Sequence, residues 1–368
     1  MTRAAAVLSA ALAATACGGG DGGGGGGDGA PELPFGVAER EWSWIPVAGN
    51  RCMDRSETGI GVDLDGSSDR LVVFLEGGGS CHDQPSCAGV AHQDGFGPDQ
   101  LAEFAGGGGQ SGLFDRRDAA NPFADWSYVL EPYCSGDTHA GASAEGVDGR
   151  LHDGFANLSR AMDAVAGELD GRLERVLLIG QSAGGFGATI DFDQVQQIFG
   201  DVPVDLVDDS GPPLGDATMT PCLQTEFREA WNLAATVPAD CAACTSADGG
   251  GLVNLVPFLS AKYPASRFGL VQSLGDRTMR AVYGEGYPDC DQPTVPMPAA
   301  AYAAGVAELR DDVMAALPNA RAFTIDSDGH VWTGRPLGET AVAGVSLGAW
   351  MADMVSGAEP WESAIPPD

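Results

Sequence analysis

A serine between two glycines is the residue of this chain best placed to act as a nucleophile. Gly180 and Gly184 flank Ser182 in a G-x-S-x-G motif, which follows the apolar run RVLLI and precedes a helical pattern. A sharp turn from a strand into a helix projects the serine hydroxyl, and the glycines let strand and helix approach closely. An ordinary strand-to-helix turn is the alternative, but these flanks predict that Ser182 attacks acyl groups.

A serine hydroxyl needs a general base, and the sequence offers one histidine in the required place. In folds that carry this motif, the chain order is serine, then an acidic residue, then histidine. His330, within IDSDGHVW, is the one histidine that follows Ser182, because the others stand at positions 82, 92, 139 and 152. His330 is therefore the predicted base, and a histidine in a surface loop is the alternative.

An acidic residue is needed to orient the imidazole of His330, and Asp276 is the favoured candidate. Asp276 follows the strand-like run RFGLVQSLG, between the serine and the histidine in the chain. Two competing acids come one strand earlier, and two others stand close to His330 in sequence. These competitors are Asp208, Asp209, Asp326 and Asp328.

A run of glycines after a strand can supply backbone donors to a negatively charged reaction intermediate. Gly78 and Gly79 lie in LVVFLEGGGSC, directly after an apolar run. Glycine has no side chain to hold a reacting group away from the backbone. We therefore expect the amides of Gly78, Gly79 and Ala183 to face the oxyanion, with a plain glycine turn as the alternative.

The elements that must position these residues follow from the pattern of apolar residues. Apolar runs predict strands at 71–75, 126–130, 176–179, 204–207, 268–271 and 322–325. Helical spacing predicts helices at 154–173, 189–199 and 303–317. Strands that alternate with helices indicate the α/β class. The predicted architecture is α/β-hydrolase-like: a mostly parallel central sheet with helices on both faces and disulfide-stapled insertions.

Residues 34–368 are predicted to form a single catalytic domain, because their number suits one large α/β domain with insertions. A stretch at about 212–259 is rich in Cys, Pro and Gly, and predicts an insertion or lid over the carboxyl edge of the sheet. A purely structural excursion is the alternative there. The irregular region 82–112 predicts a mobile surface loop.

The N-terminal residues predict export. Arg3 precedes a small apolar run that ends in ATAC, so residues 1–16 are the predicted lipoprotein signal peptide and Cys17 the predicted lipidation site. Ala14 stands where a larger aliphatic residue is usual, which leaves ordinary secretion with a free Cys17 as the alternative. The Gly-rich segment 17–33 predicts a flexible tether. The expected location is the cell envelope, with a lipid anchor as the only membrane attachment, or the exterior.

The cysteines of the predicted domain are even in number, as expected for disulfides in an exported chain. The close spacing of Cys81 and Cys87 suggests local stapling of one insertion, and the later four cysteines suggest stapling of another. A zinc site at Cys241 and Cys244 is the competing interpretation, but no second C-x-x-C or suitably spaced histidine accompanies it. The eight positions are Cys52, Cys81, Cys87, Cys134, Cys222, Cys241, Cys244 and Cys290.

The formal net charge of −33 predicts a strongly negative surface. Nucleic acid is excluded as a partner on this ground, and a polyanionic substrate would be repelled at low salt. Solubility is the simplest role for such a charge.

Several segments together resemble the pectin acetylesterases and the related Notum carboxylesterases. The matching segments are FLEGGGSC, NPFADWSYVLEPYCSGDTHAG, IGQSAGGFGA, VDDSGPP, SLGD and DSDGHVW, which extend from about residue 52 to residue 332. The resemblance implies a triad of Ser182, Asp276 and His330, oxyanion donors at Gly78, Gly79 and Ala183, and removal of O-acyl groups from carbohydrate or protein. It also implies no metal requirement.

The resemblance gives two further segments a place near the site. The segment YCSGD, residues 133–137, is similar to a loop beside the family's active site, and Asp209, Ser210 and Gly211 resemble the rim of its acyl pocket. Structural support is the alternative role for both. Many relatives carry a bulky aromatic where this chain has Gly79, so we expect a wider pocket wall there.

The combined prediction is a monomeric serine esterase without a cofactor that hydrolyses O-acyl, above all O-acetyl, esters. The expected acyl carrier is a polysaccharide or a small ester, and the negative charge favours a neutral acetylated glycan over pectin. The rival predictions are an esterase for lipids or polyesters, a surface binding protein that has lost catalysis, and a peptidase.

Overall fold

The computed structural model describes residues 33–290 and 295–367. The chain from Leu33 onward forms one compact unit. The predicted signal peptide, the predicted lipidation site Cys17 and nearly all of the predicted tether lie outside the described residues. None of the described helices has the length and apolar character needed to cross a membrane.

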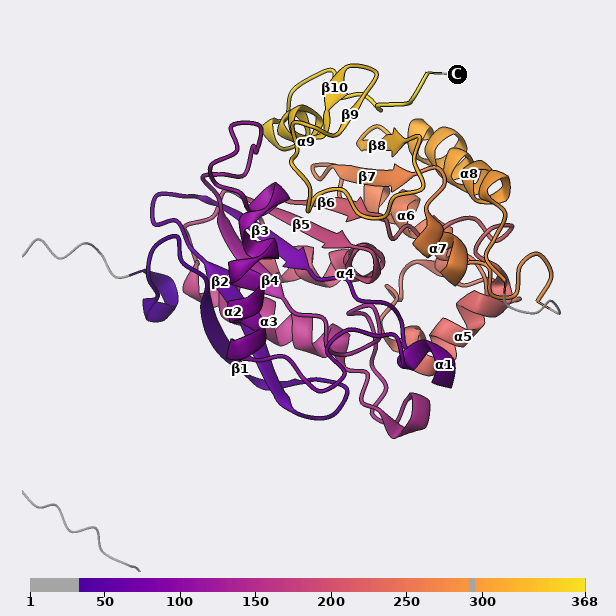
Figure 1. The fold of residues 1–368 in the computed structure, drawn as a ribbon, viewed down its shortest axis with the longest axis horizontal. Helices are drawn as coiled ribbons and strands as arrows, with labels where there is room; N and C mark the ends of the chain where they lie inside the picture. Colours follow the sequence, from indigo (N-terminus) through magenta and orange to yellow (C-terminus); the bar gives the residue numbers. More distant parts are fainter. Residues whose placement is uncertain (1–32, 291–294, 368) are drawn as a thin grey trace, which may run out of the picture. The chain divides into compact units, whose positions relative to one another are not determined.

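An eight-stranded sheet forms the centre of this unit, with strand order β1-β2-β4-β3-β5-β6-β7-β8 (Figure 1). The pairs β1–β2 and β2–β4 are antiparallel, and all pairs from β4–β3 onward are parallel. Its strands are β1 (Ser43–Arg51), β2 (Glu57–Asp63), β3 (Arg70–Leu75), β4 (Ser127–Glu131), β5 (Arg175–Gln181), β6 (Val204–Asp209), β7 (Phe268–Ser273) and β8 (Ala320–Ile325). A short ribbon pairs β9 (Ala341–Val342) with β10 (Val345–Ser346).

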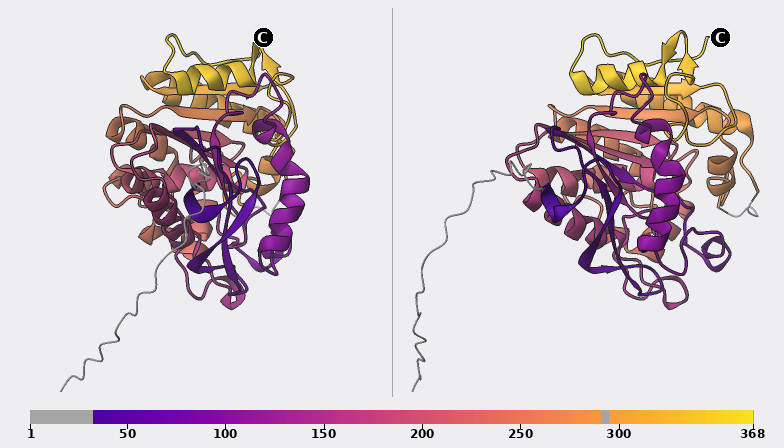
Figure 2. Two further views of the ribbon diagram at one scale, coloured as in Figure 1. Left: turned by 90° about the vertical axis from the view of Figure 1, so that its left-hand side faces the viewer. Right: turned by 60° about the vertical axis from the view of Figure 1, so that its left-hand side comes forward.

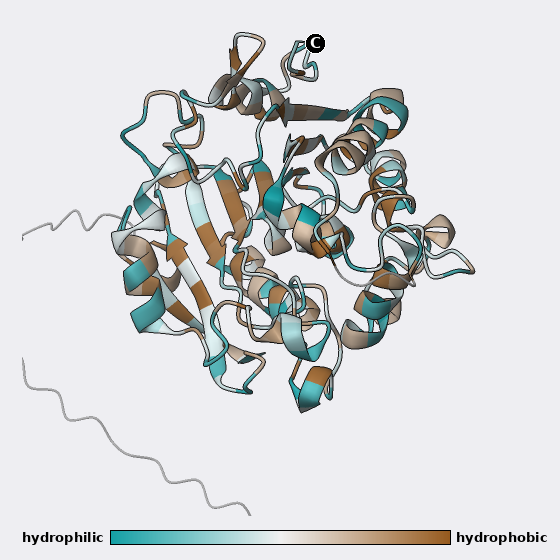
Figure 3. Cartoon of the chain, turned by 45° about the vertical axis from the view of Figure 1, so that its right-hand side comes forward, coloured by the Kyte–Doolittle hydropathy of each residue, from teal (hydrophilic) through white to brown (hydrophobic). Residues whose placement is uncertain are grey.

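Alternate residues of each central strand pack into two separate cores, one on each face of the sheet. On β3, Leu71 and Val73 join the core beneath the helices α3 (Gly154–Glu168) and α4 (Ala183–Phe199), whereas Val72 and Phe74 join the core beneath α9 (Leu347–Ser356). This period of two is the geometry of a strand buried on both faces. It explains why these strands read as continuous apolar runs, and Figure 3 shows hydrophobic colour concentrated on them.

Helices cover both faces of the sheet, and two further views show the β1–β2 edge and the C-terminal elements at the opposite edge (Figure 2). Both α3 and α6 pack against α4. The helices are α1 (Gln84–Cys87), α2 (Pro98–Gly106), α3 (Gly154–Glu168), α4 (Ala183–Phe199), α5 (Pro221–Trp231), α6 (Leu255–Lys262), α7 (Arg277–Val282), α8 (Ala299–Glu308) and α9 (Leu347–Ser356). The predicted α/β-hydrolase-like fold class is confirmed.

All six predicted strands are present, and the sequence analysis missed β1 and β2. β1 lies at the edge of the sheet, is only partly buried and carries Pro46 and Gly49, whereas β2 is buried but contains Gly59 and Gly61. Neither strand therefore forms a continuous apolar run, so the pattern used to find the buried parallel strands did not detect them.

The three predicted helices exist with different ends. The helix predicted at 154–173 ends at Glu168, and the one predicted at 189–199 begins at Ala183, directly after Ser182. The glycines of the GGFG segment interrupt the apolar spacing in the first turn of α4, so the sequence pattern did not predict that turn. The helix predicted at 303–317 begins at Ala299 and continues beyond Glu308 as a π turn and a 3₁₀ turn.

Two irregular regions are more ordered than predicted. The prediction of a surface loop at 82–112 is wrong, because this region contains α1 and α2 and buries Leu101 against the sheet. The excursion predicted at 212–259 occupies most of the connection between β6 and β7, and it includes α5 and the first part of α6. Its side chains contribute to the core, since Phe227 and Trp231 are buried there.

Four disulfides join the eight cysteines of the described residues. The pairs are Cys52–Cys134, Cys81–Cys87, Cys222–Cys290 and Cys241–Cys244. The predicted stapling of the Cys81–Cys87 segment and of the later group is confirmed. The zinc alternative at Cys241 and Cys244 is wrong, because the two sulfurs are bonded to each other. Disulfides at this density are typical of proteins that fold outside the reducing cytosol.

Candidate active site

Ser182 occupies the turn between β5 and α4 at the carboxyl edge of the sheet. Its backbone has φ 55° and ψ −118°, a conformation that L-residues rarely adopt. Two hydrogen bonds hold the turn: the Ser182 amide donates to the carbonyl of Asp209 at 2.7 Å, and the Phe186 amide donates to the carbonyl of Ser182 at 3.1 Å. Strain of this kind is kept at functional sites where the surrounding structure enforces it.

The glycines of the motif are required by the close approach of three elements. A Cβ on Gly184 would lie 2.1 Å from the carbonyl oxygen of Leu75 on β3. A Cβ on Gly180 would lie 2.0 Å from the carbonyl oxygen of Gly184. The spacing G-x-S-x-G therefore lets β3, β5 and α4 meet around the serine, as the sequence analysis expected.

The structure brings Asp276 and His330 together. The imidazole Nδ1 of His330 lies 2.7 Å from a carboxylate oxygen of Asp276, and the Asp276 side chain is fully buried. The other carboxylate oxygen accepts hydrogen bonds from the amides of Thr278 and Met279 at the start of α7, at 2.9 and 3.0 Å. These contacts fix the carboxylate, which in turn fixes the orientation of the imidazole ring.

The opposite ring nitrogen of His330 is available for chemistry. Nε2 is buried and has no hydrogen-bond partner among the described residues, so it is not bonded to the Ser182 hydroxyl. Both side chains nevertheless line the same cavity. Catalytic hydrogen bonds in unliganded sites are often long and tighten when substrate binds.

The competing acids take other positions. Asp328 forms an ion pair with Arg277, and no contact joins Asp326 or Asp328 to the His330 ring among the described residues. Asp208 accepts hydrogen bonds from Gly211 and Thr189 beneath the site, and burial raises its pKa to about 7. None of these three orients the imidazole.

Asp209 supports the histidine loop, which is the structural role that the sequence analysis gave as the alternative for this segment. One of its carboxylate oxygens accepts from the amides of Trp332 and Thr333, at 2.8 and 2.7 Å, and from the Thr333 hydroxyl at 2.7 Å. The Thr333 hydroxyl also accepts a hydrogen bond from the side chain of Gln181 at 2.8 Å. The end of β6 and the residue before the nucleophile thereby hold the loop that carries His330.

Ser210 adds a further contact to this loop, because its hydroxyl accepts from the amide of Val331 at 3.2 Å. Neither Asp209 nor Ser210 lines the cavities beside Ser182. The contacts therefore give Asp209 and Ser210 a supporting role, whereas the resemblance suggested that they form the rim of a pocket. The sequence signal for this role was that both polar residues come soon after the predicted strand 204–207.

The glycine loop after β3 leaves its amides free. The amides of Gly78 and Gly79 have no acceptor among the described residues, and Ala183 is the first residue of α4, where backbone donors lack helical partners. Gly79 has φ 88°, which favours glycine. These amides have no acceptor in the part of the chain that the structure describes, and they remain the predicted donors to an oxyanion formed at Ser182.

Tyr133 and Glu76 hold the glycine loop in place. The Tyr133 hydroxyl donates to the carbonyl of Gly79 at 2.8 Å and accepts from the amide of Thr138 at 2.9 Å. The Glu76 carboxylate accepts from the Tyr133 amide at 3.0 Å, and the Glu76 carbonyl lies 2.8 Å from a ring nitrogen of His139. The YCSGDTHAG segment thus supports the loop, and burial raises the pKa of Tyr133 well above its usual value, so its hydroxyl stays protonated.

Two cavities meet at Ser182. The larger, here called the open cavity, has a volume of about 510 Å³ and is lined by His330, Gly78 and the aromatic rings of Phe104 and Phe114, among others. The smaller, here called the small pocket, has a volume of about 70 Å³. Its apolar lining comes from Ala183, Phe186, Phe227, Met279, Val282 and Tyr283. Gly79, Ser182 and Thr278 line both cavities.

The strand order, the strained serine turn and the Asp276–His330 pair define a protein of the α/β-hydrolase class. A family model described as pectinacetylesterase matches residues 45–262, which is more than half of the chain. The chain therefore belongs to the pectinacetylesterase family, as the resemblance predicted.

Curated relatives include Notum proteins. The chain is 30% identical over 158 residues to palmitoleoyl-protein carboxylesterase NOTUM of Schmidtea mediterranea, a match that covers 40% of this chain and 28% of that protein. It is 27% identical over 146 residues to palmitoleoyl-protein carboxylesterase notum2 of Xenopus laevis, covering 39% of this chain and 30% of that protein. The matches thus span less than a third of these relatives' length.

A solved structure has the same fold. The structure of the Wnt deacylase Notum from Drosophila superposes with a TM-score of 0.63 and 18% sequence identity. The superposition covers 89% of this chain and 100% of that chain. At this identity the likeness establishes the fold.

Proposed function

We propose that this protein is a serine carboxylesterase that hydrolyses short O-acyl esters, with Ser182 as nucleophile, His330 as general base and Asp276 as the residue that orients the base. The observation that carries the proposal is the 2.7 Å contact between Asp276 and His330 beside a cavity that Ser182 also lines. Family membership supports the same reaction class.

The proposed reaction proceeds through an acyl-enzyme. Nε2 of His330 takes the hydroxyl proton of Ser182 as the oxygen attacks the ester carbonyl, and the amides of Gly78, Gly79 and Ala183 stabilise the oxyanion. His330 then protonates the departing alcohol. Water, deprotonated by the same nitrogen, releases the carboxylic acid and restores the serine.

The size of the small pocket supports a short acyl group. Its volume of about 70 Å³ is roughly one seventh of the volume of the open cavity, which is about 510 Å³. An acetyl group fits such a space, whereas a fatty acyl chain requires the pocket to open. The lipid and polyester alternative is therefore disfavoured.

The open cavity supports an acyl carrier of about the size of a sugar. Its volume of about 510 Å³ falls within the usual range for small-molecule sites, and the rings of Phe104 and Phe114 offer faces on which a sugar can pack. We propose an acetylated, uncharged carbohydrate, because the net charge of −33 repels polyanions such as pectin.

The first test is hydrolysis of p-nitrophenyl acetate by the purified protein and by Ser182→Ala. We expect the substitution to lower kcat by at least about 10⁴-fold without changing the thermal midpoint by more than a few degrees. Serine-independent turnover by a folded mutant would remove Ser182 from its role. Absence of any turnover by the unaltered protein would favour the binding-protein alternative.

A second test concerns acyl length. We expect acetate to be cleaved faster than butyrate, and octanoate slowest. Val282→Ala enlarges the small pocket by about two carbons, so it should raise the butyrate-to-acetate ratio of kcat/KM by about tenfold. Val313→Ala, at a valine packed elsewhere in the core, is the matched control and should leave the ratio unchanged. An octanoate preference in the unaltered protein would refute the short-acyl proposal.

We also propose that the chain is exported as a monomer and attached to a membrane through lipidated Cys17. The ATAC motif and the four disulfides support export. Cys17→Ser should move the protein from the membrane fraction to the soluble fraction. Equal fractionation of both forms would contradict the anchor.

A further inference from the structure

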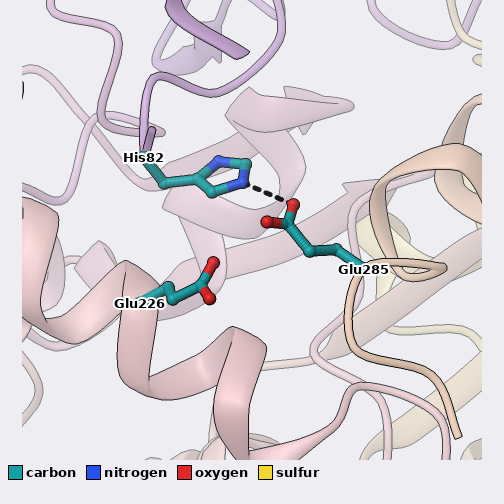
Figure 4. Close-up of side chains that lie close together, drawn as sticks. All are labelled: His82, Glu226 and Glu285. Carbon is teal, nitrogen blue, oxygen red and sulfur yellow. Dashed lines mark hydrogen bonds and ion pairs between the residues drawn. The ribbon is translucent and has the colours of Figure 1, made fainter. Parts of the chain in front are cut away.

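A histidine and two glutamates converge beside the proposed active site without belonging to it. Among the described residues, His82, Glu226 and Glu285 form a group whose ligand atoms all lie within 4.8 Å of one another. Figure 4 shows the two carboxylates facing each other below the imidazole ring. The Nε2 atom of His82 lies 2.8 Å from a carboxylate oxygen of Glu285.

The imidazole of His82 is held rigidly with one nitrogen turned toward the carboxylates. Its side chain is only 3% exposed and packs edge-on against the rings of Phe227 and Trp231. Nδ1 lies 3.1 Å from the hydroxyl of Ser80. A hydrogen bond at one ring nitrogen that leaves the other directed at a site is the usual arrangement of a metal-binding histidine.

Two disulfides fix the three segments that carry these side chains. His82 lies inside the loop closed by Cys81–Cys87. The Cys222–Cys290 bond joins the start of α5, which bears Glu226, to the segment that bears Glu285. Ligands supplied by covalently fastened segments lose little conformational entropy when an ion binds, which favours binding.

The negative charge of the two glutamates is only partly balanced by the protein. Among the described residues, His82 pairs with Glu285, and no lysine or arginine forms an ion pair with Glu226 or Glu285. The two carboxylates therefore repel each other. A cation between the carboxylates would remove this repulsion.

We propose that His82, Glu226 and Glu285 bind one divalent transition-metal ion such as Zn²⁺ or Mn²⁺. One imidazole nitrogen with two carboxylates suits such ions, whereas Mg²⁺ and Ca²⁺ prefer oxygen ligands alone. Zinc–ligand distances of about 2.0–2.2 Å put ligand atoms about 3.4 Å apart. The exposed Glu226 side chain must therefore close on the ion by about an ångström.

The site would stabilise the small pocket. Ser80, which stands two residues before His82, lines that pocket. Phe227, which is next to Glu226 in the chain, lines it too. Tyr283, two residues before Glu285, lines it as well. Binding would therefore tie together three walls of the pocket, while the reacting groups Ser182 and His330 need no metal.

The test measures binding in protein freed of metal with a chelator. Isothermal titration should give one Zn²⁺ or Mn²⁺ per chain, and an ion concentration about 100 times Kd should raise Tm by about 5 °C. Glu226→Gln and Glu285→Gln should each weaken Kd at least about tenfold. Mg²⁺ should give a much smaller effect.

Glu229→Gln is the matched control, because it removes the same charge from an exposed position on the same helix without touching the group. It should bind the ion as the unaltered protein does. Absence of saturable binding by the unaltered protein, or equal affinity in Glu226→Gln and Glu285→Gln, would overturn the proposal. So would an equal response to Mg²⁺. These readouts do not depend on esterase activity, so they stand apart from the proposed function.

Discussion

Two adjacent aspartates at the end of β6 are expected to behave in opposite ways. Burial raises the pKa of Asp209, but its four accepted hydrogen bonds, three of them from the loop that carries His330, favour the charged form. Asp208 accepts two, from Gly211 and Thr189, and its pKa of about 7 makes it partly protonated at neutral pH. An amide resembles a protonated carboxyl, so the two positions should tolerate asparagine differently.

We predict that Asp209→Asn lowers the free energy of unfolding by about 2 kcal/mol, because hydrogen bonds to a buried charged group are lost. It should also lower kcat more than it raises KM, since the His330 loop would loosen. Asp208→Asn is the control and should cost about 0.5 kcal/mol or less at pH 7. Urea unfolding and p-nitrophenyl acetate kinetics measure both effects. Equal costs at the two positions would contradict this division of roles.

The turn from β5 into α4 shows how elements, and not single residues, create the nucleophile. Residues of β3, β5 and β6 all contact this turn: Gly184 approaches the carbonyl of Leu75, and the Ser182 amide bonds to Asp209. The parallel register places these strand ends at one edge of the sheet. Ser182 keeps its positive φ because the three strands leave the turn no other path.

Gly184→Ala should therefore prevent normal folding or remove activity, because its Cβ would lie 2.1 Å from a backbone oxygen that cannot move. Gly167→Ala in α3 is the matched control: nothing lies within 4 Å of the new Cβ, and alanine favours helix. That variant should gain about 0.5–1 kcal/mol. Thermal unfolding compares the two. An active Gly184→Ala protein of normal stability would contradict the proposed constraint.

The balance of charge makes the whole molecule more stable in mild acid than in base. Burial raises the pKa of Glu131 to about 8 and that of Asp208 to about 7, whereas both titrate near 4 when the chain is unfolded. Between about pH 4.5 and 8, the native state therefore binds more protons than the unfolded state. Stability must then fall as pH rises through this window. The net charge of −33 adds repulsion in the same direction.

We predict that Tm, measured in chelator, is several degrees higher at pH 5 than at pH 8. Glu131→Gln should flatten this dependence by removing one contributing group, and added salt should raise Tm more at pH 8 than at pH 5. Below about pH 4 the trend should reverse, because hydrogen bonds lower the pKa of acids such as Asp115 in the folded state. A Tm that increases steadily from pH 5 to pH 8 would refute the prediction.

Local patterns determined a large part of this protein. Apolar runs sufficed for the six parallel strands because each strand is buried on both faces. Chain order left five candidate acids, and the position of Asp276 directly after a predicted strand favoured it as the partner of His330. The motif around Ser182 and the glycine run after β3 could be interpreted from the residues directly before and after them in the sequence. These features depend on residues close together in the chain, or on an order that the parallel fold imposes.

Only the tertiary structure decided how the site is supported. The antiparallel strands β1 and β2 have no continuous apolar run. The hydrogen bonds between Asp209 and the residues Trp332 and Thr333 join parts of the chain more than 120 positions apart. The meeting of His82, Glu226 and Glu285 likewise depends on three loops that the fold brings together. Such contacts leave no local period or motif in the sequence, because their geometry is set by the packing of the sheet and its insertions.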